Sequence, residues 1–225
     1  MGDEDVEYKA EYLDTAEDAE PEVANWLPRP GKAKVTYAEG SSFEGVFNGE
    51  RIKEGAGKYT WMKPAEEDGE DPQVYATYAG NYTDGKKAGM GKMTYPNGDE
   101  YTGEWKDNAM EGEGTYVYKA TGDIYSGSWV ANKKTGKGMY QFGADDSTMH
   151  GTWANGTITE GTWVFKDGTV YTGHFEGGRP KGEGKFVFPS DISQVGYYET
   201  VAAEEGADEE EPPALLWRGQ SIVSC

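Results

Sequence analysis

The chain has 225 residues, a formal net charge of −20 and a single cysteine, Cys225. A chain this acidic is repelled by nucleic acids and anionic membranes, so nucleic-acid binding is excluded and membrane binding is disfavoured. Its 33 glycines, together with 30 aromatic residues and no three-residue glycine period, favour short strands and tight turns over helices.

Residues 1–30 form an acidic N-terminal extension with ten acids and two bases. It lacks the basic and apolar regions of a signal peptide, and no segment approaches the roughly 18 apolar residues of a membrane span. One cysteine admits no intrachain disulfide, which fits a reducing cytosol. We interpret the extension as a solvated tail that protects open sheet edges; a charged surface that faces a partner is the alternative.

Residues 31–200 repeat a two-part pattern. The first part is aromatic-x-Gly-x-aromatic, as in Tyr101-Thr-Gly103-Glu-Trp105, and its copies from Tyr78 onward are spaced by 23, 24, 24, 22 and 23 residues. The second part is Gly-x-Gly-x-aromatic-x-aromatic, as in Gly112–Tyr118. Because side chains alternate along a strand, rings and glycines share one face and polar residues the other. Each unit is therefore predicted to be an antiparallel β-hairpin.

The array is irregular at four places. A half unit, Gly31–Tyr37, precedes the first full unit, and an acidic insert near residues 63–74 lengthens the next connection. The unit that begins at Met149 is two residues short and keeps one glycine of its pair. The array ends on a trailing first strand at Gly196–Tyr198, followed by an acidic tail with an apolar end over residues 201–225. An incomplete last unit predicts that this end docks a partner or a second copy, or that the tail folds back as a cap.

Glycines beside aromatic residues have a physical reason in such a sheet. A ring that lies flat on the sheet needs a neighbour without a side chain, and aromatic residues that cover cross-strand glycines supply this arrangement. One hairpin is marginally stable in water, so stacked hairpins must cover each other's rings.

These motifs resemble the MORN (membrane occupation and recognition nexus) repeat, whose unit reads roughly Y-x-G-x-W-x-x-G-x-x-x-G-x-G. The resemblance implies an all-β fold, an elongated, single-layer, twisted antiparallel sheet of MORN-repeat hairpins. In detail, the short unit Gly151–Thr162 and the closing stretch Gly184–Glu199 are most similar to small MORN proteins of the radial spoke head in motile cilia and flagella.

That resemblance implies a structural scaffold and protein-interaction subunit of the axonemal radial spoke head, located in the cytoplasm, the cytoskeleton and the axoneme of the cilium or flagellum. The expected partners are other radial spoke head proteins, with central-pair projections and a homodimer or MORN–MORN pairing as further candidates. The alternative is a membrane- or cytoskeleton-tethering MORN module outside the axoneme.

No constellation of residues indicates catalysis. Two histidines, His150 and His174, and one terminal cysteine cannot form a four-ligand zinc site, and no G-x-S-x-G motif occurs. The segment Gly80–Lys86 resembles a P-loop, but it falls within a predicted hairpin and Lys87 replaces the required Ser or Thr. We therefore expect no enzyme activity, no metal and no cofactor.

The aromatic face is the candidate partner-binding surface. Most of its rings are expected to stack on glycines and to be structural, yet a continuous exposed stripe of rings is typical of a binding surface. The stripe consists of Tyr101, Trp105, Tyr116, Tyr125, Trp129, Tyr140, Trp153, Trp163, Tyr171, Phe175 and Phe186. The docking tail Leu215-Leu216-Trp217 is expected to occupy part of this stripe when the partner is absent.

Overall fold

The structure is a computed structural model and describes residues 8–14, 23–24, 27, 29–63, 72–201 and 214–224. Most of the acidic insert near residues 63–74 and the first half of the C-terminal tail lie outside these residues. All regular elements of the described chain are strands, and none of it forms a helix long and apolar enough to cross a membrane. The prediction of an all-β fold built from antiparallel hairpins is confirmed.

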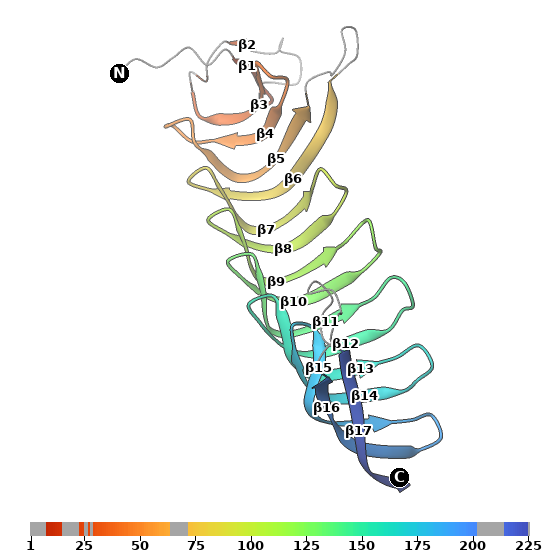
Figure 1. The fold of residues 1–225 in the computed structure, drawn as a ribbon. Coiled ribbons are helices and arrows are strands. Elements are labelled where there is room, and N and C mark those ends of the chain that lie inside the picture. The colour runs from red at the N-terminus through yellow and green to blue at the C-terminus, as the bar shows by residue number, and fades with distance from the viewer. Residues whose placement is uncertain are drawn as a thin grey trace. The chain divides into compact units, whose positions relative to one another are not determined.

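The chain divides into two compact units, Met1–Ala120 and Thr121–Cys225. The strands of the N-terminal unit, in chain order, are β1 (Tyr8–Tyr12), β2 (Val23–Ala24), β3 (Gly31–Tyr37), β4 (Ser42–Phe47), β5 (Lys53–Lys63), β6 (Gln73–Thr83), β7 (Lys86–Thr94), β8 (Glu100–Lys106) and β9 (Ala109–Val117) (Figure 1). From β3 to β9, each strand pairs antiparallel with the next.

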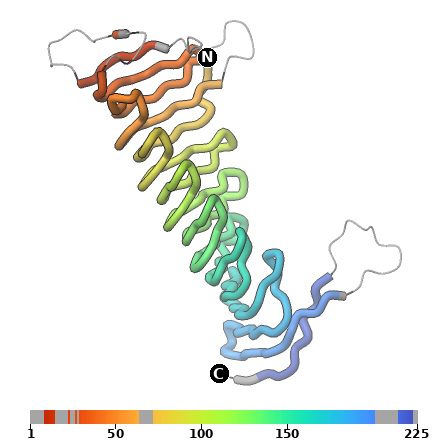
Figure 2. Tube along the Cα trace, turned by 90° about the vertical axis from the view of Figure 1, so that its left-hand side faces the viewer, coloured from red at the N-terminus to blue at the C-terminus, as the bar shows by residue number. Residues whose placement is uncertain are grey.

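The C-terminal unit has the same organisation. Its strands are β10 (Ile124–Val130), β11 (Lys133–Gln141), β12 (Thr148–Ala154), β13 (Thr157–Val164), β14 (Val170–Glu176), β15 (Arg179–Val187), β16 (Ile192–Val201) and β17 (Ala214–Ser224). Consecutive strands pair antiparallel throughout. Within each unit, the Cα trace folds back and forth as successive hairpins (Figure 2).

A row of glycines crosses each sheet at directly opposed positions. In the C-terminal unit the row contains Gly127, Gly138, Gly151, Gly161, Gly173, Gly184, Gly196 and Gly219. The N-terminal unit has the same row, with Ala33 at its start. A Cβ placed on Gly103 would lie 2.6 Å from Oη of Tyr101, so the ring occupies the space of the missing side chain. The row explains why one glycine recurs in every strand.

The other glycine of the Gly-x-Gly pair has a different role. In the hairpin of β8 and β9, Gly103 opposes Gly114 but Glu104 opposes Glu111, so two residues of β9 bulge out of the ladder. The first of them, Gly112, has φ of 62°, a left-handed conformation that favours glycine. In the shortened unit, Thr152 opposes Glu160 and Trp153 opposes Ile158, so a single residue bulges and the first glycine is not needed.

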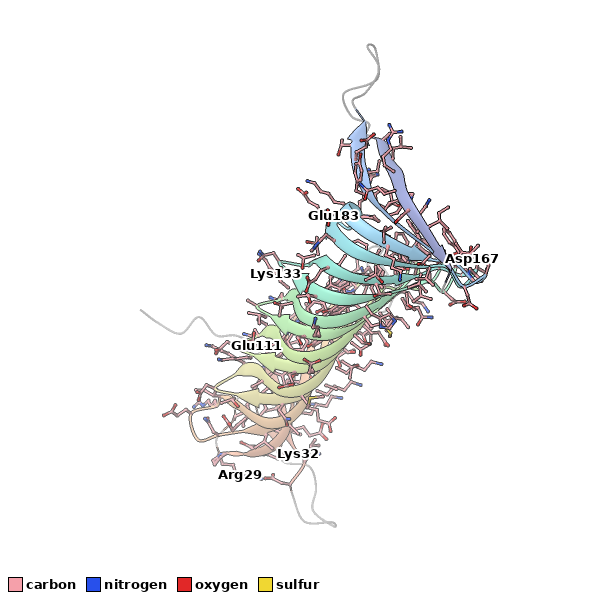
Figure 3. The ribbon with its side chains drawn as sticks, turned by 90° about the horizontal axis from the view of Figure 1, so that it is seen from below. Arg29, Lys32, Glu111, Lys133, Asp167 and Glu183 are labelled. Carbon is pink, nitrogen blue, oxygen red and sulfur yellow. The ribbon has the colours of Figure 1, made fainter. Side chains whose placement is uncertain are left out.

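Turns of two kinds join the strands. Tight turns such as Ala131–Asn132 and Asn155–Gly156 have positive φ at both central residues, as the type I′ hairpin turn requires. Longer turns, such as the one that carries Asp167, lie at the opposite ends of the strands from Lys133 (Figure 3). The strand ladder thus alternates between tight and longer turns along each sheet.

Part of the acidic N-terminal extension belongs to the N-terminal unit. Strand β1 pairs with β3, and the two-residue β2 pairs with β1. The ring of Tyr12 is 1% exposed and lies 4.0 Å below the Arg29 guanidinium, which also binds Asp14 at 2.9 Å. Tyr12 precedes the repeat array, so the repeat pattern does not predict its place in the core.

Candidate functional site

The rings of the first strands form the core of each sheet. Seven of the eleven residues predicted for the aromatic stripe are 6% exposed or less: Tyr101, Trp105, Tyr125, Trp129, Trp153, Tyr171 and Phe175. Each first-strand tyrosine lies against the glycine row, and its hydroxyl bonds a backbone carbonyl three residues later, as Tyr101 does with Glu104 at 3.0 Å. These seven rings are therefore structural, as expected for most of the stripe, and a partner cannot reach them without opening the core.

The same edge-to-face arrangement of rings recurs along these buried rings and covers them from two sides. Within one strand, Tyr101 and Trp105 meet edge to face at 5.1 Å, and Tyr125 and Trp129 do the same at 5.2 Å. The next hairpin then adds a second edge-to-face ring, since Trp153 lies 5.0 Å from Tyr125. Such ring pairs contribute about 0.5–1.5 kcal/mol beyond the area they bury. Each repeat thus covers the ring of the repeat before it.

The second strands carry a different set of rings, which remain partly exposed. We call the set in the C-terminal unit the outer ring row; it consists of Tyr140, Phe142, Trp163, Phe165, Phe186 and Phe188. Its members form a continuous ladder with successive centroid distances of 4.9, 5.7, 4.5, 6.3 and 6.0 Å. Three of the four remaining predicted residues, Tyr140, Trp163 and Phe186, lie in this row.

The N-terminal unit has corresponding partly exposed rings. Tyr116, the last of the predicted residues, stacks between Tyr95 at 5.7 Å and Tyr118 at 4.6 Å. The sequence pattern placed all eleven rings on one face, which is correct, but it did not separate buried rings from accessible ones. The separating signal is position in the hairpin, because first-strand rings cover the glycine row and second-strand rings lie beyond it.

Two aspartates fix the outer tyrosines in place. Asp99 accepts hydrogen bonds from the Tyr116 hydroxyl at 2.9 Å and from the backbone N–H of Lys119 at 2.8 Å. Asp123 accepts equivalent bonds from Tyr140 at 2.6 Å and from Gly143 at 2.8 Å. Burial alone would raise the pKa of Asp99, but these hydrogen bonds outweigh it and hold that pKa below its usual value.

The shortened unit lacks this aspartate. Ser147 lies two residues before Met149, where Asp99 and Asp123 lie two residues before Tyr101 and Tyr125. The Oγ of Ser147 is buried and has no hydrogen-bond partner, and the same is true of Nε1 of Trp163 in the outer ring row. In the units that begin at Tyr101 and Tyr125, the aspartate and an outer tyrosine form a hydrogen bond. In the shortened unit, neither Ser147 Oγ nor Trp163 Nε1 has a hydrogen-bond partner.

Three lysines cover inner rings at equivalent positions of the repeat. Lys53, Lys87 and Lys134 each oppose the second aromatic residue of an aromatic-x-Gly-x-aromatic motif. The Nζ of Lys134 lies 4.6 to 5.3 Å from the centroids of Tyr125, Tyr140 and Trp153. Removal from water lowers the pKa of Lys134 to about 8, against the opposing effect of Asp123. Other repeats place Met110, Ile158 or Pro180 at this position, so an apolar side chain also occurs opposite the second aromatic residue.

The docking tail forms the last strand of the C-terminal unit. Strand β17 pairs with β16, and the Trp217 ring lies 4.9 Å from Phe186 and 5.1 Å from Tyr198. Its Nε1 donates a hydrogen bond to Oε1 of Gln194 at 2.8 Å. Gln194 replaces the tyrosine of a regular first strand, and Trp217 covers Gly196 from the opposite strand instead. Leu215 is partly buried, whereas Leu216 is 41% exposed.

An open groove borders the outer ring row. It has a volume of about 420 Å³ and is lined by Phe165 and Phe186 together with Asp145, Lys166, Asp167 and Thr169. Figure 3 shows Asp167 at the turn end of the sheet. The groove combines two ring faces with charged residues of both signs, a composition suited to a peptide segment rather than to a reacting substrate.

Polar residues do not converge on a reaction centre in the described part of the chain. His150 and His174 are exposed on the face opposite the rings, and His150 bonds only the hydroxyl of Thr148. Among the described residues, no group of three or more His, Cys, Asp or Glu side chains could hold a metal ion.

Comparison with known proteins identifies the repeat. The profile of the MORN repeat matches residues 78–100, 101–120, 125–147 and 171–191, which together are less than half of the chain. The chain is similar to MORN repeat-containing protein 3 of Xenopus laevis, with 54% identity over 35 residues, which are 15% of this chain and 15% of that protein. The chain thus matches only a small part of that relative's length.

One solved structure is also similar. It is the TCP domain of SAS-4 (dCPAP) of Drosophila melanogaster in complex with a proline-rich motif of Ana2 (dSTIL). The sequence identity is 12% and the TM-score 0.38, over 85% of this chain and 96% of that chain. A similarity this low identifies neither the fold nor the function.

Proposed function

Because four segments of the chain match the MORN repeat, we propose that the protein is a structural scaffold and interaction subunit of the radial spoke head in the axoneme, where it supports ciliary or flagellar motility. MORN repeats form a repeat-based interaction module, and the module is non-enzymatic. The radial spoke assignment rests on the resemblance of the short unit Gly151–Thr162 and the closing stretch Gly184–Glu199 to spoke head MORN proteins.

The observation that carries the interaction role is the outer ring row with its groove. Its rings stack in one continuous ladder and stay partly exposed, while the inner rings form the core. Aromatic side chains are the commonest anchors of protein interfaces. The partners proposed for this row are other radial spoke head proteins, with central-pair projections and a second MORN chain as further candidates.

A tethering role outside the axoneme is the second candidate. The MORN repeats are compatible with a cytoskeletal tether, but the net charge of −20 opposes a membrane tether. Each basic residue near an anionic membrane contributes about 1 kcal/mol of attraction, and this chain has the opposite sign. Flotation with anionic liposomes separates the two roles, since a membrane tether floats with the vesicles.

Fractionation of detergent-extracted cells tests the axonemal assignment. The protein is expected to stay with the axonemes and to leave them together with other spoke components in high salt. Full release by detergent alone would contradict the assignment.

The outer ring row is tested in the same assay. Phe165→Ala should weaken axonemal retention, by about 2 kcal/mol in partner affinity if the ring is an anchor. Thr172→Ala, an exposed position on the opposite face, is the matched control and should leave retention unchanged. Trp129 is unsuitable for this test, because it is 3% exposed and its removal would disturb the core. Retention of a folded Phe165→Ala variant at the wild-type level would contradict the role of the row.

A further inference from the structure

The two ends of the described chain differ in how their strand edges are protected. In the N-terminal unit, the first strands are the five-residue β1, with Lys9 and Glu11, and the two-residue β2. In the C-terminal unit, the last strand is β17, with 11 residues, of which Arg218 is the only charged one. Native proteins blunt exposed edges with short strands and charges, because a long uncharged edge pairs with other chains. Strand β1 follows this rule, whereas β17 does not.

Among the described residues of its unit, β17 pairs with β16 alone, which leaves its other edge open. Apolar side chains on the ring face continue to this edge. Ile222 opposes Gln194, which shares the ring face with Gly196 and Tyr198, and Ile222 is 68% exposed. Ile192 on the same face is 40% exposed. A further strand paired with β17 would lie beside Ile222 and cover it.

The internal repeats show what kind of strand covers such an edge. Tyr82 closes over Phe43 at 5.1 Å, Trp105 over Tyr78 at 5.3 Å, and Tyr198 over Tyr171 at 5.7 Å. In each case the covering ring comes from the first strand of the next repeat. The last covering ring from a first strand is Tyr198; Trp217 follows on β17, and the described residues of the C-terminal unit form no strand beyond β17.

The glycine row sets the register of the missing strand. Each second-strand glycine opposes the glycine of the next aromatic-x-Gly-x-aromatic motif, as Gly184 opposes Gly196 and Gly161 opposes Gly173. Gly219 ends this row. An incoming strand with glycine opposite Gly219 would place its two rings on the ring face, one on each side of the row, beside Trp217 and Ile222.

We propose that the open edge of β17 is a docking site for an antiparallel strand of a partner polypeptide that carries the pattern aromatic-x-Gly-x-aromatic. The backbone of the incoming strand extends the sheet, and its rings cover Trp217 and Ile222 as the next repeat would. This mode of recognition combines main-chain hydrogen bonds with side-chain selection at alternate positions. The proposal rests on the interaction role proposed above and names the chemistry of one partner.

A peptide titration on the full-length chain tests the proposal. The probe is a synthetic peptide with the sequence of Val170–Glu176, which is a first strand of this chain. The peptide is expected to slow hydrogen exchange of the β17 amides and to change the fluorescence of Trp217. A control peptide with serine at both ring positions should bind at least about tenfold more weakly. Equal binding of the two peptides, or no protection of β17, would overturn the proposal.

Two lysine substitutions locate the contact. Ile222→Lys places a charge on the ring face at the edge and should weaken the peptide by about tenfold. Leu216→Lys places the same charge on the opposite face of β17 and should bind the peptide close to wild-type strength. Circular dichroism checks that both variants fold. A folded Ile222→Lys variant that binds normally would also overturn the proposal.

The peptide assay uses the purified chain, so it is independent of the axoneme. A wild-type chain that binds the peptide but leaves axonemes with detergent alone contradicts the radial spoke assignment and supports the docking edge. A chain that stays with axonemes but does not bind the peptide supports the radial spoke assignment and contradicts the docking edge.

Discussion

At the scale of single residues, the lysines that cover rings are held in an unusual environment. Lys134 lies among three aromatic rings, and removal from water lowers its pKa to about 8. Because the unfolded chain has a lysine pKa near 10.4, the unfolded state binds more protons between about pH 8 and pH 10.4. The contribution of Lys134 to stability should therefore rise with pH across this window.

Reactivity toward an acylating reagent reports this pKa directly. We expect the modification rate of Lys134, followed by peptide mass spectrometry, to rise with a midpoint near pH 8. The Lys134→Met variant, which copies Met110 at the equivalent position, should lose this titration and the stability gain above pH 8. A midpoint near 10.4 would mean that the rings do not withdraw the amine from water.

The hydrogen bonds of Asp99 lead to a second prediction, on the stability of the chain. Asp99→Ala leaves the Tyr116 hydroxyl and the Lys119 N–H without their acceptor, so it should lower the free energy of unfolding by about 1–3 kcal/mol in urea titrations. Lys119→Ala is the control, because it removes an exposed side chain and keeps the N–H group; it should change stability by less than about 0.5 kcal/mol.

The pH dependence of Asp99 follows from its depressed pKa. Its contribution is present above the unfolded-state pKa of about 3.9 and is lost as the pH falls through the lower folded-state value. The wild-type chain should therefore lose stability more steeply than Asp99→Ala below about pH 4. Parallel stability curves for the two chains in acid would contradict the hydrogen-bonded carboxylate.

At the scale of the strand, the glycine row is the feature on which ring packing depends. Gly103→Ala would place a Cβ 2.6 Å from the hydroxyl of Tyr101 and 2.5 Å from Cα of Gly114. The ring or the strand must move, so the substitution should cost about 1–3 kcal/mol of unfolding free energy. Thr102→Ala, on the adjacent exposed position, is the matched control and should be nearly neutral. Comparable stability of the two variants would contradict the assignment of the row.

At the scale of the whole molecule, each described unit ends on strands that lie outside the regular repeat. In the N-terminal unit, β1 and the ring of Tyr12 cover β3. In the C-terminal unit, β17 and Trp217 complete the hairpin that Gln194 begins. Because stacked repeats depend on their neighbours, such end strands stabilise the repeats beside them.

Removing the Trp217 ring should therefore loosen the last repeats. Trp217→Ala deletes ring contacts at 4.9 Å to Phe186 and 5.1 Å to Tyr198. We expect the free energy of unfolding to fall by about 2 kcal/mol, less than the roughly 3–5 kcal/mol that the loss of a fully buried ring costs. Hydrogen exchange should speed up in β15 and β16, whereas Leu216→Ala, at a 41% exposed position, should leave it unchanged. Unchanged exchange in Trp217→Ala would show that the tail does not close the unit.

The sequence by itself determined the hairpin repeat and its ring and glycine face. This was possible because alternation along a strand is a local property, and one motif recurs at 22 to 24 residues. It also marked the unit at Met149 as short. The bulge of one residue in place of two accounts for one residue of that shortening and for the missing glycine.

Only the tertiary structure decided which rings are buried and what closes the ends. The sequence places Tyr101 and Tyr116 on the same face, yet Tyr101 lies on the glycine row at 0% exposure and Tyr116 lies beyond it, held by Asp99. The sequence predicts that the tail Leu215-Leu216-Trp217 docks on the aromatic stripe, but it does not predict a strand there. Trp217 replaces the ring missing at Gln194 because the chain returns after residue 201 to pair with β16. Burial and end closure depend on contacts between strands distant in the chain, which a local period does not contain.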